Sequence, residues 1–246
     1  MTRWSERLRE RFYTDVDHPY QVYAKKVDAI LTAQMVLLDA GCGRTAPVLT
    51  SYVGRAKHLI GVDLVDFVDV PDAIETHRCD LARMPVSSNS VDLIISRSVF
   101  EHLQDPVSVY CEFNRVLKPG GHLVFLTGNM WDYGTLVARA IPNKFHAKIV
   151  RWTEGRAEED TFPTAYRTNT ASAIHRLADR EGLIVESIEY LNQYPNYLMF
   201  NGLFFLAGVA YERITSRVEF LRFLRGWLLV TLKKPVSVQA LEQSTA

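Results

Sequence analysis

Cysteine is scarce in this chain, and its three cysteines follow no pattern. Cys42, Cys79 and Cys111 have neither a paired spacing nor the short spacing typical of metal ligands. The segment that starts at Met1 is charged rather than apolar, unlike a secretory signal peptide. We therefore expect a reduced, cytoplasmic protein without a metal site.

Neither sign of charge is in excess. The 28 lysines and arginines balance the 28 aspartates and glutamates, so the basic surplus of a nucleic-acid-binding protein is missing. No linker, internal repeat or low-complexity tract divides the sequence. With 246 residues, of which 48% are hydrophobic, the chain can bury one full core. We expect a single domain over residues 1–246, with one domain plus a small appendage as the alternative. Its partner should be a small molecule or a neutral surface rather than nucleic acid.

A glycine is also missing, from a turn that otherwise fits a nucleotide site. An apolar run over 35–38 leads into Asp39-Ala40-Gly41-Cys42-Gly43, and from there to residue 63 we expect a strand, a glycine turn, a helix and a second strand. Gly41 and Gly43 let the backbone turn sharply and let a ligand approach it. The third glycine of the dinucleotide fingerprint is absent, because the next residues are Arg44-Thr45-Ala46-Pro47. This absence counts against NAD.

Two carboxylates accompany the turn and narrow the choice of ligand. Asp39 stands two residues before the first glycine, where it would repel a pyrophosphate and attract an ammonium group. Asp63 ends a second apolar run, where a carboxylate can accept both ribose hydroxyls. S-adenosylmethionine carries an ammonium group, a sulfonium and a ribose, so the pattern favours it. The alternative is an ordinary strand-to-helix turn in which Asp39 only bonds the loop.

Strand and helix signals alternate along the chain. We expect helices over 3–32 with a break at 17–20, over 105–117 and over 170–182, and strands over 35–38, 58–62, 74–79, 91–96, 122–127, 184–190 and 227–232. Such alternation favours a parallel sheet with crossover helices. Few regular signals occur between 128 and 168, apart from an amphipathic piece near 136–141. We expect this excursion to cover a substrate.

Five ordered segments resemble class I S-adenosylmethionine-dependent methyltransferases. They are Asp39 to Gly43, Asp63, Asp80-Leu81, Phe100-Glu101-His102-Leu103 and Val116 to Gly121. The nearest group is the type 11 set of small-molecule enzymes related to ubiquinone and menaquinone methyltransferases. The resemblance covers roughly residues 20–130 and implies an enzyme with S-adenosylmethionine as its cofactor.

The resemblance also implies a fold and a division of the chain. The fold is a Rossmann-like, seven-stranded, mostly parallel sheet flanked by helices. Residues 1–34 form a helical cap, 35–127 the donor-binding half, and 128–246 the acceptor-side half with inserted substrate-side segments.

Site residues follow position by position from the same resemblance. Asp39, Gly41 and Gly43 hold the methionine moiety, Asp63 the ribose, Asp80 and Leu81 the adenine, and Ser96 the region near the sulfonium. Leu64 is also placed in the donor site, and Tyr20 or Tyr23 closes over the donor, with core packing as the alternative for each tyrosine. The reaction is a displacement at the methyl carbon, in which the protein mainly aligns the partners and excludes water. His102 can serve as a general base for a hydroxyl acceptor, and fixing the loop by hydrogen bonds is its alternative role.

Two segments beyond residue 130 bear on the acceptor. Tyr166 and Arg167 lie in a turn-rich stretch before Thr170, where they can grip an anionic acceptor; the alternative is a loop that Thr170 caps. Residues 202–211 are apolar on every side. Ten helical residues rise about 15 Å and cannot cross a hydrocarbon core of about 30 Å.

Basic residues follow that apolar stretch, so contact with anionic lipid through 202–234 is one expectation, and a core helix between the last two strands is the other. The leading hypothesis is methyl transfer to a small molecule, with lipid-linked, quinone-like and glycan intermediates as candidate acceptors. Its alternative is a catalytically silent methyltransferase-like scaffold at a membrane-associated complex. We expect a cytoplasmic protein, with the membrane surface as the open alternative; the oligomeric state is not predicted.

Overall fold

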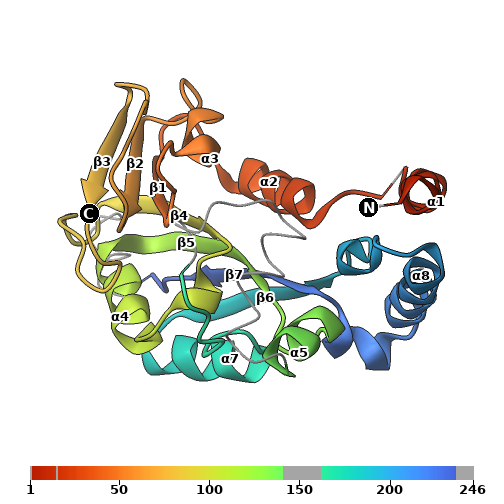
Figure 1. Ribbon diagram of the computed structural model, residues 1–246. Coiled ribbons are helices and arrows are strands. Elements are labelled where there is room, and N and C mark those ends of the chain that lie inside the picture. The colour runs from red at the N-terminus through yellow and green to blue at the C-terminus, as the bar shows by residue number, and fades with distance from the viewer. Residues whose placement is uncertain (1, 15, 141–161, 237–246) are drawn as a thin grey trace. The chain divides into compact units, whose positions relative to one another are not determined.

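The computed structural model describes residues 2–14, 16–140 and 162–236 (Figure 1). Contacts divide the chain into two compact units. The helical unit comprises residues 1–22, 128–164 and 190–228, and the sheet unit comprises 23–127, 165–189 and 229–246. The expected donor-binding half, 35–127, lies wholly within the sheet unit. The expectation of one domain over the whole chain stays a prediction.

Seven strands form one sheet in the order β3-β2-β1-β4-β5-β7-β6. They are β1 Val36–Ala40, β2 His58–Asp63, β3 Ile74–Arg78, β4 Val91–Arg97, β5 Leu117–Gly128, β6 Ile184–Leu191 and β7 Trp227–Lys233. β1 to β5 pair with one another in parallel. Reciprocal bonds, from Gly120 N to Lys234 O and from Lys234 N to Gly121 O, are typical of antiparallel pairing between β5 and β7. The expected seven-stranded, mostly parallel sheet is confirmed.

The central strands read as continuous apolar runs because both of their faces are covered. Leu37 and Leu38 of β1 and Ile94 and Ile95 of β4 are fully buried. Helices α4 (Pro106–Val116) and α7 (Ala171–Arg180) lie on the opposite side of the sheet from α2 (Pro19–Ile30) and α3 (Pro47–Thr50) (Figure 1). This layering leaves the ends of the parallel strands as the place where the sheet unit can present polar groups.

The described residues form seven helices, and those predicted over 3–32, 105–117 and 170–182 begin and end close to the predicted residues. The seven helices are α1 Arg3–Tyr13, α2 Pro19–Ile30, α3 Pro47–Thr50, α4 Pro106–Val116, α5 Tyr133–Ala140, α7 Ala171–Arg180 and α8 Gly202–Arg217, with short 3-10 segments η1 Phe100–His102, η3 Asn196–Leu198 and η4 Glu219–Leu224. Asp105 and Thr170 cap α4 and α7 by accepting bonds from Ser108 N and Ala173 N. Side-chain oxygens satisfy helix-terminal N–H groups in this way, so both predicted caps are confirmed.

Two local predictions were inexact. The helix after the glycine turn is the single turn α3, and the chain turns back toward β2 through Gly54, whose φ is +77°. The fifth strand begins at Leu117 rather than at residue 122, because Leu117 already pairs with Val91 of β4. A register shift follows between Val91 and Leu93. Such a shift depends on the partner strand and leaves no trace in the local sequence.

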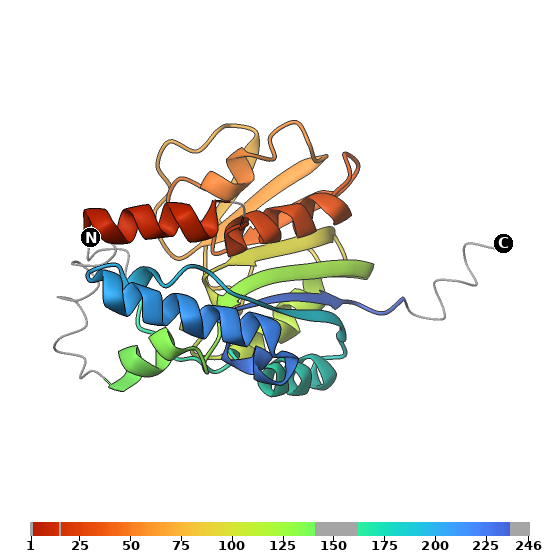
Figure 2. The same ribbon diagram turned by 90° about the vertical axis from the view of Figure 1, so that its right-hand side faces the viewer.

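In the helical unit, α1 and α8 run side by side (Figures 1 and 2). At one end of the pair, the ring of Trp4 packs so closely on Gly202 that a Cβ there would lie 1.9 Å from it. At the other end, the Tyr13 hydroxyl donates to Glu212 Oε2 at 3.1 Å. Between these contacts, Phe205 and Val209 form a buried cluster with other apolar residues of the unit. The apolar stretch expected at 202–211 is therefore part of a longer helix with one packed face.

Candidate functional site

The glycine turn after β1 is rigid and open at one position. Gly41 and Gly43 have φ values of +79° and +76°, in the left-handed region that side chains rarely adopt. A Cβ on Gly41 would lie 2.3 Å from Val99 Cγ2, whereas a Cβ on Gly43 would meet nothing within 4 Å. Gly41 N donates to Val62 O at 2.8 Å and so fixes the turn to β2. Ligand approach is therefore possible at Gly43.

Asp63, at the end of β2, joins two loops through its carboxylate. Oδ2 accepts from Gly43 N at 2.7 Å, and Oδ1 accepts from Leu64 N at 2.7 Å and from Val65 N at 3.2 Å. A carboxylate offers about four lone-pair positions, so about one stays open to an incoming hydroxyl. Backbone N–H groups thus occupy more of the acceptor positions of Asp63 than the sequence suggests.

Asp39 and Tyr23 place two unpartnered oxygens in the interior of the sheet unit. Asp39 is 2% exposed and Tyr23 is 1% exposed. Within the described residues, neither Asp39 Oδ2 nor the Tyr23 hydroxyl has a hydrogen-bond partner. Buried polar atoms without partners typically cost about 1–3 kcal/mol each and are rare unless a ligand or water completes them.

The electrostatics of this pair favour a cation. Burial raises the pKa of the Asp39 carboxyl to about 7, with Arg97 lowering it and Asp63 raising it further. The pKa of Tyr23 is also raised well above its usual value, first by burial and then by the Asp39 charge. An ammonium group would satisfy the carboxylate and reverse this penalty, because an opposite charge stabilises the ionised form.

The other expected donor residues lie at the ends of neighbouring strands. Asp80 is exposed after β3, and its Oδ1 accepts from Ala82 N at 2.9 Å, while Leu81 is buried. The Leu64 side chain is exposed after β2. The Ser96 hydroxyl donates to Ala40 O at 2.7 Å and is buried. That hydroxyl ties β4 to β1, so the expected place of Ser96 near a sulfonium stays a prediction.

Residues 38–125, which contain the glycine turn and most of the residues just described, match the family model whose description is "Methyltransferase domain". This segment is similar to class I methyltransferase domains. The expected resemblance is confirmed at this level, and the finer likeness to ubiquinone and menaquinone enzymes stays a prediction.

Curated relatives match this methyltransferase domain over part of their length. An arsenite methyltransferase of Aquipseudomonas alcaligenes is 29% identical over 143 residues, which cover 51% of this chain and 41% of that protein. An uncharacterized methyltransferase of Schizosaccharomyces pombe is 30% identical over 174 residues, which cover 62% and 57%. The chain therefore spans about half the length of these relatives.

Solved structures share the fold at low sequence identity. An S-adenosylmethionine-dependent methyltransferase of Mesorhizobium loti aligns with a TM-score of 0.56 and 20% identity over 85% of this chain and 96% of that one. The geranyl diphosphate C-methyltransferase of Streptomyces coelicolor aligns with a TM-score of 0.52 and 17% identity over 87% and 78%. The expected Rossmann-like architecture is confirmed.

The residues of the methyltransferase domain fit S-adenosylmethionine, the cofactor of this family. The buried oxygens of Asp39 and Tyr23 would hold its ammonium group, the open backbone at Gly43 would admit its methionine part, and Asp63 would accept a ribose hydroxyl. When bound, the cofactor supplies an electrophilic methyl group. The fit rests on unpartnered atoms that a cation would complete.

His102 lies in η1, just after β4, and is half-buried. Its backbone N–H donates to Val99 O at 2.9 Å, so the main chain of η1 is fixed. Nothing in the structure separates the base from the loop-fixing role, and both stay predictions.

A polar network beside His102 escaped sequence reasoning. Glu101 Oε2 accepts from the Thr127 hydroxyl at 2.7 Å, and the same hydroxyl accepts from Asn169 Nδ2 at 2.7 Å. Thr127 and Asn169 are fully buried. The network joins η1, the end of β5 and the segment before α7. Its one sign in the sequence is Thr127, a polar residue at the end of an apolar strand.

The expected acceptor residues Tyr166 and Arg167 bond the backbone around η1. Ala165 N and Tyr166 N donate to Glu101 O at 2.7 and 3.1 Å, and the Arg167 guanidinium donates to Gln104 O. These contacts support the alternative of a structured loop ahead of α7. A contact of either residue with an acceptor stays a prediction.

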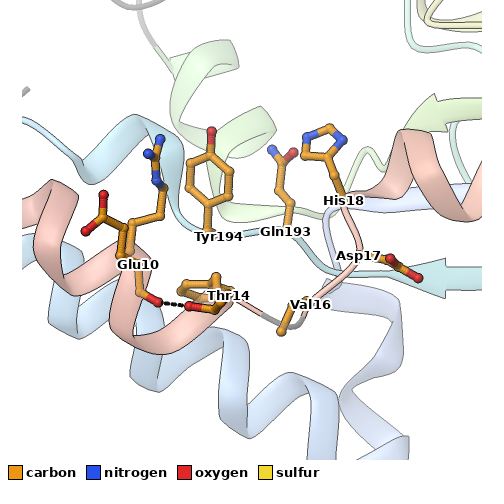
Figure 3. Close-up of a pocket in the computed structure, with 9 residues that line it drawn as sticks. Glu10, Thr14, Val16, Asp17, His18, Gln193 and Tyr194 are labelled. Atoms are coloured by element: carbon orange, nitrogen blue, oxygen red, sulfur yellow. Dashed lines mark hydrogen bonds between the residues drawn. The ribbon is translucent and has the colours of Figure 1, made fainter.

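A pocket of about 320 Å³ lies within the helical unit (Figure 3). Its lining comes from the end of α1, the following loop and a segment after β6, namely Arg9, Glu10, Tyr13, Thr14, Val16, Asp17, His18, Gln193 and Tyr194. The Arg9 guanidinium lies 5.7 Å from the centre of the Tyr194 ring, so the positive charge is already stacked on an aromatic face. Charges of both signs line the pocket, which gives it no clear preference for an anion or a cation.

Proposed function

We propose that the protein transfers a methyl group from S-adenosylmethionine to a small-molecule acceptor. The observation that carries the proposal is the buried Asp39 carboxylate, whose Oδ2 has no hydrogen-bond partner among the described residues and which lies just before an open glycine turn. The family match over residues 38–125 supports the same reaction. Lipid-linked, quinone-like and glycan intermediates are the acceptors we propose to test first.

The names of the relatives support a small acceptor without selecting one. They include an arsenite methyltransferase and a cycloartenol-C-24-methyltransferase. Because these acceptors differ so much in chemistry, we infer that the donor site is common to such proteins and that other parts of each chain select the acceptor. For this chain we propose that residues 128–235 supply the acceptor contacts.

In this proposal the protein acts mainly by positioning. Asp39 and Tyr23 anchor the cationic end of the donor, and Asp63 both accepts a ribose hydroxyl and holds the two loops in place. Fixing both reactants in a dry site supplies most of the catalysis of a displacement reaction. For a hydroxyl acceptor, His102 would take the proton as a general base, which typically adds about a hundredfold to ten-thousandfold.

Binding of S-adenosylhomocysteine tests the donor site. At about one hundred times its dissociation constant, the ligand should raise the free energy of unfolding by about 2.7 kcal/mol. Asp63→Ala should remove much of that gain, because a charged acceptor is lost, whereas Asp179→Ala, at an exposed position of α7, should keep it. No stabilisation of the unaltered protein, or tighter binding of NAD, would exclude the proposal.

Transfer itself is tested with isotopically labelled donor and two cell extracts, one lipid and one aqueous. A labelled product in either extract supports the proposal, and mass spectrometry identifies its class. Donor binding without product in both extracts would instead favour the silent scaffold.

A further inference from the structure

Helix α8 has two faces of different character. One face is buried in the helical unit and includes Phe205 and Val209. The opposite face carries Leu203, Ala207, Ala210 and Ile214, which are all exposed. Their spacing of four, three and four residues places them in one stripe along the helix. Leu203 is 69% exposed and Ile214 is 54% exposed, so the stripe is apolar and open to solvent.

Exposed aromatic residues extend this stripe at both ends of α8. Phe200 and Phe204 lie at its start, with ring centres 5.5 Å apart. Phe220 and Phe223 follow its end in η4, and Phe220 is 83% exposed. We call the exposed residues of 200–223 the α8–η4 surface; Figure 2 shows α8 along its length. Several neighbouring exposed apolar residues of this kind are typical of an interaction site.

The α8–η4 surface is positively charged. Arg213, Arg217 and Arg222 are exposed. The carboxylates nearby are already engaged, since Glu212 accepts from Tyr13 and Ser216, and Glu219 pairs with Arg222 and Arg225. Between residues 202 and 225 there are four arginines and two glutamates, a surplus of two positive charges in a chain whose net charge is zero.

Arg225 fixes η4 to the end of α8. Its side chain is 15% exposed, and its guanidinium donates to Thr215 O at 2.9 Å and to Ser216 O at 3.2 Å. Phe220 and Phe223 are therefore carried by a segment that is bonded to the helix rather than loose. The aromatic and aliphatic groups together form a pre-organised surface.

We propose that the α8–η4 surface docks on an anionic lipid membrane. Its apolar side chains would enter the boundary between headgroups and acyl chains, and its arginines would meet the anionic headgroups. A second copy of the chain is a poorer match, because in this surface it would offer only Glu212 and Glu219, which are both engaged. None of the described helices is long and apolar enough to span a membrane, so the contact is peripheral.

Vesicle sedimentation of the full chain tests the inference. We compare vesicles of phosphatidylcholine alone with vesicles that also contain phosphatidylglycerol, at low and high salt. Binding should require phosphatidylglycerol and weaken as salt rises. Replacing Arg213, Arg217 and Arg222 by glutamine should weaken it about fivefold per arginine. Replacing Leu203, Phe204 and Ile214 by serine should weaken it by roughly tenfold or more.

Control variants carry changes of the same kind elsewhere. Val53→Ser with Ile184→Ser alters exposed apolar residues, and glutamine at Arg83, Arg176 and Arg180 alters exposed arginines. Both controls should bind vesicles as the unaltered protein does. Urea unfolding, measured on every variant, checks that each is folded and does not depend on the proposed methyl transfer.

Three outcomes would overturn the inference. The first is no binding of the unaltered protein to phosphatidylglycerol vesicles, and the second is an equal loss in the control variants. The third is a concentration-dependent dimer that the serine variant dissociates, which would make this surface a contact between copies.

Discussion

At the scale of single residues, Asp39 links the donor site to pH. Its carboxyl has a pKa of about 7, because burial disfavours the charged form. An ammonium ligand needs the ionised form. Below pH 7, binding must therefore be accompanied by loss of a proton, and the affinity for S-adenosylhomocysteine should fall by up to about tenfold per pH unit between pH 7 and 5. Titration calorimetry at pH 5.5, 6.5 and 7.5 measures this slope, which Asp39→Asn should flatten.

The raised pKa of Asp39 also leads to a prediction about the stability of the protein. The folded pKa of about 7 lies above the ordinary value of 3.8, so the folded state binds more protons than the unfolded state in this window. The contribution of Asp39 to the free energy of unfolding is therefore lost as pH rises from about 4 to 7. Asp39→Asn should stabilise the ligand-free protein at pH 8 by at most about 4 kcal/mol. Urea unfolding at pH 8 and pH 4 checks this, and a gain of equal size at both values would contradict it.

Gly43 offers a way to separate ligand approach from backbone strain. Gly43 and Gly54 have nearly equal φ values, +76° and +77°, and a Cβ on either meets nothing within 4 Å. Alanine at either position should cost roughly 1–2 kcal/mol of stability, because left-handed backbone disfavours a side chain. Only Gly43→Ala should also weaken donor binding, since its methyl group occupies the approach to the turn. Equal donor affinity in the two variants would remove Gly43 from the site.

Sequence reasoning predicted donor residues but not all of their hydrogen-bond partners. The glycine turn and the acidic residues stand out because their spacing is local. The three backbone bonds to Asp63 and the bond from Ser96 to Ala40 depend on how strands distant in sequence align. The network of Glu101, Thr127 and Asn169 escaped notice for the same reason.

At the scale of elements, helix ends were predicted well where a side chain caps them. The Thr170 hydroxyl accepts from Ala173 N at 3.2 Å at the start of α7. Thr170→Ala should lower the free energy of unfolding by about 1 kcal/mol, whereas Thr170→Ser, which keeps the hydroxyl, should lose little. Chemical unfolding of the two variants gives the comparison, and equal losses would mean that the hydroxyl does not cap α7.

The extent of α8 and the start of β5 were harder to predict. A run that is apolar on every side gives no helical period, so its end at Arg217 was not evident from 202–211 alone. β5 starts early because Leu117 pairs with Val91, and a pairing between strands has no local signature. Both misses come from tertiary contacts that override local pattern.

At the scale of the whole molecule, the expected donor residues all belong to the sheet unit, and the α1–α8 pair has its own buried cluster. S-adenosylhomocysteine should therefore slow amide exchange most strongly around β1, β2 and the glycine turn. Amides in the buried face of α8 should change less. Hydrogen exchange followed by mass spectrometry tests this, and the reverse order would place the ligand in the helical unit.

The uneven charge of the α8–η4 surface has a consequence for the rest of the chain. Because the total is zero and residues 202–225 carry a surplus of two positive charges, the remaining residues carry two net negative charges. An anionic bilayer would thus repel most of the polypeptide while attracting a single short stretch. Electrostatic torque during diffusion would turn that stretch toward the lipid before any apolar side chain touched it.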